Sequence, residues 1–108
     1  MKNKLIIFEI KHGKVEKLKR WYQKLDSIRR DEALESIRRE GVKRKFATIV
    51  QLNEKYYDIG FSEVSNGAKV LPADQSMSVN LEHRAIMEDC LVTPPFKGEL
   101  LYDLEYTP

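Results

Sequence analysis

The segment of residues 14–41 constrains the fold more than any other, because it is one long amphipathic stretch whose apolar stripe shifts partway along. Its first half repeats apolar residues at helical spacing, namely Val15, Leu18, Tyr22 and Leu25. At about 100° per residue, that face then continues through polar side chains, Arg29, Glu32 and Ser36. The apolar Leu34 and Ile37 lie elsewhere around the helix. We therefore expect the helix to bend near residues 27–31 or to project past its sheet, with Leu34 and Ile37 packed on the partner subunit or on the start of the second strand.

The rest of the chain alternates between strand and helix patterns. A second helix is expected after a loop over residues 65–75, and it runs to about Leu91, shortly before Pro94 and Pro95. We expect its N-terminal cap to be one of three polar residues, Asp74, Ser76 or Ser78. Four segments have the composition and alternation of strands, namely residues 4–10, 42–52, 56–64 and 99–106.

The resulting element order, βαββαβ, is that of the ferredoxin-like split βαβ arrangement. It predicts a single α+β domain over residues 1–108, with a four-stranded antiparallel sheet and two helices on one face. The other face of the sheet is then bare, and we expect Leu5, Ile7 and Tyr56 to lie on it. Such a face is too apolar to stay in water. A homodimer formed through it is the simplest remedy.

Composition limits the classes of protein to which this chain can belong. Charged residues make up 33% and hydrophobic residues 42%, which is ordinary for a globular protein. No apolar run approaches the length of a membrane span, and the run at residues 5–8 ends at Glu9 without the features of a signal peptide. Cys90 is the single cysteine. We therefore expect a cytoplasmic protein that does not bind a membrane.

The two halves of the chain carry opposite charge. Residues 1–45 contain 15 basic and 7 acidic residues, and residues 46–108 contain 4 and 10. This asymmetry indicates either an anionic partner or contact between the two halves, within a chain or across a dimer. Acidic residues interleaved along the basic helix favour the second reading. RNA-binding domains of this topology stack bases on strand aromatics, but their sequence signature is missing here, so we expect no nucleic-acid partner.

Three motifs carry a resemblance to a known family: KHGKVEKLKRW in residues 11–21, RRDEALESIRREGV in residues 29–42 and LEHRAIMEDC in residues 81–90. With these motifs the chain resembles a family of small uncharacterised bacterial proteins, a domain of unknown function. The resemblance implies membership of the wider group of dimeric α+β barrels, whose fold is ferredoxin-like. That group contains monooxygenases, mutarotases, haem enzymes and ligand-binding regulators, so the fold alone does not choose a function.

His83 is the main candidate for catalysis. It shares one helical face with Val79, Ile86 and Cys90, so its imidazole points toward the sheet. There it is either a general acid or base or a core histidine bonded to a neighbouring polar group, and the second reading is the more common. Two helices of this fold run antiparallel, which brings Trp21 and Tyr22 level with His83. A ligand pocket of these three side chains is therefore the easiest to build.

Arg29 and Glu32 are the second pair of candidates. Three residues apart on one helix, they are positioned to form an ion pair, and a buried arginine beside a glutamate suits an anionic or polyhydroxy ligand. The structural alternative is that both are solvated or hold a partner subunit. The length of the helix favours that alternative.

We predict no metal and no cofactor. His83 and Cys90 are two helical turns, about 10 Å, apart along the axis, too far for direct zinc ligation, and no glycine-rich phosphate loop is present. The function predicted is that of a homodimer that binds or turns over a small organic molecule between helices and sheet. The alternative is a non-catalytic assembly or regulatory module that uses its long first helix as a protein interface.

Overall fold

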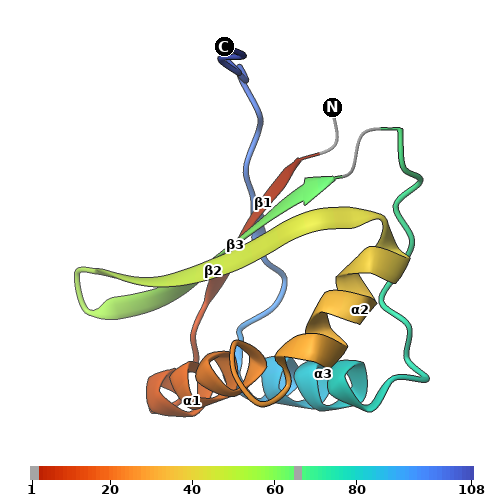
Figure 1. Cartoon of the computed structure of the whole chain (residues 1–108). Helices are drawn as coiled ribbons and strands as arrows, with labels where there is room; N and C mark the ends of the chain where they lie inside the picture. Colours follow the sequence, from red (N-terminus) through yellow and green to blue (C-terminus); the bar gives the residue numbers. More distant parts are fainter. Residues whose placement is uncertain (1–2, 65–66) are drawn as a thin grey trace.

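The computed structural model describes residues 3–64 and 67–108, and within them four antiparallel strands form one sheet accompanied by three helices (Figure 1). The strands are β1 (Lys4–Glu9), β2 (Val42–Leu52), β3 (Lys55–Val64) and β4 (Phe96–Lys97). The helices are α1 (Val15–Leu25), α2 (Arg30–Glu40) and α3 (Ser78–Cys90). The α+β class is confirmed. Of the loop predicted over residues 65–75, Ser65 and Asn66 lie outside the described residues.

The strands lie in the order β2-β3-β1-β4, and each neighbouring pair is antiparallel. The long β2–β3 hairpin turns at Asn53, whose φ of 59° lies in the left-handed region that asparagine tolerates. Along the centre of the sheet, Ile7 of β1 faces Ile59 of β3. The first three predicted strands are confirmed to within a residue or so at their ends.

The last predicted strand is wrong. Pairing with β1 is limited to Phe96 and Lys97, which face Ile7 and Ile6, and residues 99–108 have no regular secondary structure. Alternation alone predicted the strand, but a strand also needs a neighbour to accept its backbone hydrogen bonds. In Figure 1 this segment leaves the sheet and extends away from the helices.

The predicted long helix is interrupted where its stripe shifts. Residues 26–29 form a turn between α1 and α2, so the bend is confirmed, although the segment is two helices rather than one. At this turn the Ser27 hydroxyl donates to the carbonyl oxygen of Gln23 at 2.6 Å, a local bond that competes with helix continuation. α2 ends at Gly41 (φ 78°), as expected of a helix-terminating glycine.

α1 and α3 lie side by side, and α2 rises from them toward the start of β2 (Figure 1). The buried core joins α1 and α3 to the end of β1, through Ile10, Leu18, Cys90 and Leu91. Leu34 is 47% exposed, so its expected packing on a partner subunit stays a prediction. α2 instead turns polar residues inward: Ser36 is 2% and Glu40 is 6% exposed.

The two faces of the sheet differ in what covers them. The inner face carries Asp58 and Lys45, which bond to α1 and α2. Tyr56 alternates with Asp58 on this same face, so its predicted position on the bare face is wrong. The outer face carries apolar side chains along its middle, namely Leu5, Ile7, Phe46, Ile59, Phe61 and Phe96. Toward its two ends it also carries Glu9 and Glu63, which pair with Lys55 and Lys43.

Candidate functional site

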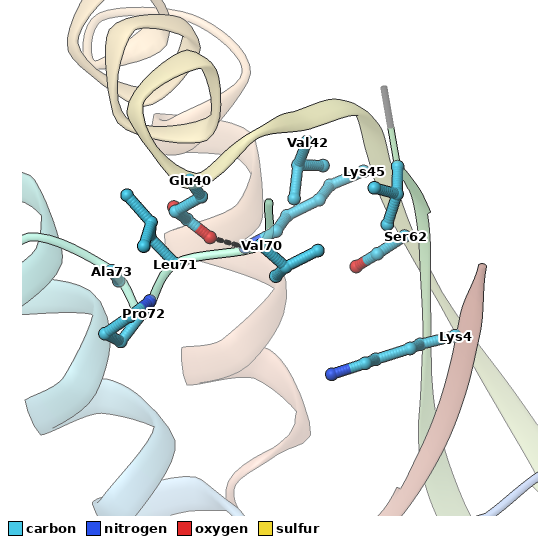
Figure 2. A pocket seen from close by; sticks show the side chains of 10 residues that line it. Lys4, Glu40, Val42, Lys45, Ser62, Val70, Leu71, Pro72 and Ala73 are labelled. Carbon is cyan, nitrogen blue, oxygen red and sulfur yellow. Dashed lines mark hydrogen bonds and ion pairs between the residues drawn. The ribbon is translucent and has the colours of Figure 1, made fainter. Parts of the chain in front are cut away.

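A pocket of about 380 Å³ lies between the inner face of the sheet and the segment of residues 70–73 (Figure 2). One side is aliphatic and is formed by Val42, Val64, Val70 and Leu71. The other side is polar, and Figure 2 shows Lys4 and Ser62 extending from the strands toward residues 70–73. A further hollow of about 660 Å³ is lined by residues of the β2–β3 hairpin alone, Leu52–Lys55 and Tyr57.

Glu40 and Lys45 form an ion pair at the wall of this pocket. The Lys45 ammonium donates to Glu40 Oε1 at 2.7 Å, and the Ser36 hydroxyl donates to Glu40 Oε2 at 3.0 Å. Both carboxylate oxygens are therefore satisfied, as a side chain with only 8% exposure requires. The αL turn at Gly41 reverses the chain between α2 and β2, which brings these two residues together.

The loop side of the pocket is held by backbone and side-chain bonds to the helices. Leu71 N–H donates to the carbonyl oxygen of Glu40 at 3.0 Å, next to the ion pair. Asn80 of α3 donates to the Ser36 hydroxyl at 2.7 Å and to the Asp74 carbonyl oxygen at 2.9 Å. The polar face of α2 thus connects the loop, α3 and the sheet.

His83 lies behind the ion pair and is not one of the residues that line the pocket. Trp21 Nε1 donates to His83 Nδ1 at 2.9 Å, so the neutral ring carries its proton on Nε2. Burial and the Lys45 ammonium lower the pKa of His83 to about 4, although Glu40 acts in the opposite direction. At neutral pH His83 is therefore an uncharged hydrogen-bond donor, not a base with a free lone pair.

No hydrogen bond joins Tyr22 to His83 in the described residues. The Tyr22 hydroxyl donates to Asp58 Oδ2 at 2.8 Å, because the next residue along a helix points about 100° away from Trp21. Burial raises the pKa of Asp58, and burial together with the Asp58 charge raises that of Tyr22. Asp58 Oδ1 is buried without a hydrogen-bond partner among the described residues. The structure therefore separates the predicted pocket into a Trp21–His83 pair and a Tyr22–Asp58 pair.

Arg29 and Glu32 are paired, with Nε to Oε1 at 3.0 Å. Arg29 also donates to Glu82 and, at 3.0 Å, to the Ser78 hydroxyl. Its side chain is only 16% exposed, and its donors are used in joining the α1–α2 turn to the start of α3. Neither residue lines the pocket at residues 70–73, so in this chain the pair lies apart from it.

Sequence reasoning missed the residues that line the pocket, above all Lys4, Glu40 and Lys45. One signal was available: Glu40 lies four residues after Ser36 and so continues the polar face of the first helix. Lys4 could not be predicted as a pocket residue. It lines the pocket only because residues 70–73 cover the sheet beside it, and a local sequence pattern does not give the path of such a loop. Cys90 is buried, and this burial raises the pKa of its thiol.

In the described part of the chain, no group of three or more potential metal ligands comes together. Likewise, none of the helices in residues 3–64 and 67–108 has the length and apolar character needed to cross a bilayer.

The protein is of the α+β class. Its pocket is small and has an aliphatic side and a polar side, and the polar side includes the Lys4 ammonium. Residues 1–107 match the model of a family of unknown function, DUF6176. The chain belongs to this family, and the resemblance noted from its motifs is confirmed. Searches of curated proteins and of solved structures found no match.

Proposed function

We propose that this protein binds a small organic acid in the pocket formed by the inner sheet face and residues 70–73. The observation that carries the proposal is an ammonium group in the pocket wall that has no ion-pair partner in the described residues. Lys4 lines the pocket and makes no ion pair within residues 3–64 and 67–108. An ammonium beside an aliphatic wall recognises a molecule with a carboxylate at one end and a short carbon chain at the other.

The neighbouring groups support this class of ligand. The carboxylate would bind Lys4 and the Ser62 hydroxyl, and the carbon chain would lie on Val70 and Leu71. Lys45 is already neutralised by Glu40, so the pocket offers one net positive charge. A volume of about 380 Å³ is at the small end of ligand sites, which suits a small acid.

Thermal unfolding in the presence of small mono- and dicarboxylic acids tests the proposal. A bound acid at about 100 times its Kd should stabilise the fold by about 2.7 kcal/mol. Lys4→Gln should abolish the stabilisation, and Val70→Phe should do so by filling the pocket. Val92→Phe is the control, because Val92 has nearly the same exposure (37% against 39%) but does not line the pocket. No stabilisation by any acid would contradict the proposal.

We further propose that the chain has a ferredoxin-like fold with a broken first helix, and that it forms a homodimer in the cytoplasm. The strand order β2-β3-β1-β4, with helices on the inner face, supports the fold. The dimer is supported by the apolar outer face, where Leu5, Phe46 and Phe96 are 39, 47 and 60% exposed. Light scattering should give about twice the chain mass of 12.7 kDa.

A second candidate is an assembly module that binds a partner protein through the first two helices. It is favoured by Ile28 and Leu34, which are 77 and 47% exposed at and beyond the α1–α2 turn. The screen described above separates the two functions. Stabilisation that depends on Lys4 supports ligand binding, whereas no response to any acid supports the assembly module.

A further inference from the structure

The pocket at residues 70–73 contains a row of three polar side chains that come from neighbouring strands. Lys45 of β2 lies opposite Ser62 of β3, and Ser62 lies opposite Lys4 of β1. Residues directly opposite each other in an antiparallel pair point to the same face, with Cβ atoms about 5 Å apart. Figure 2 shows Ser62 between the two lysines. This polar row therefore gives the pocket an ammonium group at each end and a hydroxyl group in the middle.

The two ends of the polar row differ because Glu40 lies at one of them. The Lys45 ammonium donates to Glu40 Oε1 at 2.7 Å, whereas Lys4 has no acidic partner within residues 3–64 and 67–108. An ammonium has three donors, and a carboxylate oxygen accepts two hydrogen bonds. The ion pair uses one of each. Beside Ser62 the pocket therefore still offers a donor on Lys45 and an acceptor on Glu40, next to each other.

A hydroxyl group is the ligand group that matches this donor and acceptor. It both accepts and donates a hydrogen bond, so it can accept from Lys45 and donate to Glu40 at the same time. A carbonyl oxygen only accepts, and it would bring its lone pairs close to the Glu40 carboxylate. A second carboxylate would be repelled by Glu40, because like charges placed together at a binding site oppose binding.

We propose that the acid bound in this pocket is a monocarboxylic hydroxy acid, with its carboxylate on Lys4 and Ser62 and its hydroxyl on the Lys45–Glu40 pair. This proposal rests on the acid site proposed above and names the class of ligand that the site selects. The spacing of about 5 Å between neighbours in the polar row places the hydroxyl on the first or second carbon after the carboxylate. The rest of the carbon chain lies on the aliphatic side of the pocket.

Glu40 determines this specificity because its carboxylate is held in place. The Ser36 hydroxyl donates to Glu40 Oε2 at 3.0 Å, and Leu71 N–H donates to the Glu40 carbonyl oxygen at 3.0 Å. The Glu40 side chain is only 8% exposed. A carboxylate fixed in this way is positioned before the ligand arrives, so binding costs little further ordering. Its charge therefore acts on any ligand that enters the pocket.

Titration calorimetry of the full chain with matched four-carbon acids tests the proposal. The acids are butyrate, its 2-hydroxy and 3-hydroxy derivatives, 2-oxobutyrate and succinate, which differ only in their second polar group. At least one hydroxybutyrate should have a Kd about 10-fold or more below that of butyrate, because it adds hydrogen bonds to two charged groups. Succinate should bind more weakly than butyrate, and 2-oxobutyrate should bind more weakly than the preferred hydroxybutyrate.

Glu40→Gln tests the role of the charge. Glutamine keeps the size of the side chain and its carbonyl oxygen still accepts from Lys45, but the pocket gains a net positive charge. Succinate should then bind about 10-fold or more tightly than it binds the wild-type chain. Glu35→Gln is the control, because Glu35 lies on the same helix and pairs with Arg38 and Arg39 but does not line the pocket. It should leave every Kd unchanged.

The outcomes separate this proposal from the acid site on which it rests. Equal Kd values for butyrate and both hydroxybutyrates would overturn the hydroxy-acid class and leave the acid site at Lys4 in place. Unchanged succinate binding by Glu40→Gln, with far-ultraviolet circular dichroism like that of the wild-type chain, would overturn the role of Glu40. The comparison of acids on the wild-type chain decides the ligand class even if this variant does not fold. Binding of none of the acids would overturn both proposals.

Discussion

His83 shows what sequence can predict about a single side chain. The spacing of Val79, His83, Ile86 and Cys90 correctly predicts that the imidazole points inward, and Trp21 is its neighbour as expected. The protonation state depends on further groups that no local pattern reveals. Lys45 and Glu40, which act on His83 in opposite directions, reach it only because α2 breaks away from α1 and returns the chain to the sheet.

The buried His83 should make stability fall in mild acid. Its pKa is about 4 in the folded chain and about 6.5 when unfolded, so the unfolded state binds the proton first as the pH falls. The contribution of His83 to the free energy of unfolding is therefore fully present above pH 6.5 and is lost between pH 6.5 and 4, by up to about 3 kcal/mol. His83→Gln keeps an acceptor for Trp21 and should flatten this part of the profile in urea unfolding. His12→Gln is the control, because His12 lies at an exposed turn, and it should leave the pH profile of stability unchanged. A profile that also stays unchanged in His83→Gln would contradict the role given to the buried His83.

At the scale of elements, the sequence predicted the break in the first helix but not what each half would bury. The shift of the apolar stripe at Arg29 predicts the bend, because continuing the helix would bury charges. It does not reveal that α2 buries Ser36 and Glu40 while Leu34 stays exposed. That choice depends on Asn80 and Lys45, which satisfy the inward polar groups from other elements. Local periodicity contains no information about such partners.

The junction between α2 and β2 provides a matched test of backbone conformation. Gly41 and Gly13 have nearly the same φ, 78° and 79°, so alanine should cost about 1–2 kcal/mol of strain at either position. At Gly41 an added Cβ would also lie 2.7 Å from the carbonyl oxygen of Lys69, whereas at Gly13 it meets nothing within 4 Å. Urea unfolding should therefore show Gly41→Ala to be the more destabilising by at least about 1 kcal/mol. Equal costs would contradict the close approach of the loop, and with it the shape of the pocket.

At the scale of the whole molecule, the basic first half of the chain and the acidic second half form ion pairs with each other. Lys14 and Lys17 of α1 both pair with Asp89 of α3, and these contacts lower the pKa of Asp89 to about 2. Lys24 and Arg29 likewise pair with Glu82. The expectation that the basic half lies against the acidic half is confirmed for these helices. The acidic residues after β4 have no such partners in the described residues, which distinguishes that segment from α3.

The outer sheet face should be the surface that decides assembly. Leu5 lies on this face and is 39% exposed. Leu81, a leucine of α3 that is 52% exposed, is the control position. Leu5→Lys should leave the monomer folded, since lysine extends its ammonium into water. In a dimer through this face the same ammonium would be buried without a partner, at a cost of several kcal/mol, so the Kd of dimerisation should rise at least about 100-fold. Leu81→Lys should leave light scattering unchanged. If Leu81→Lys dissociates the dimer and Leu5→Lys does not, the helical surface is the interface, and the sheet face must be covered in another way.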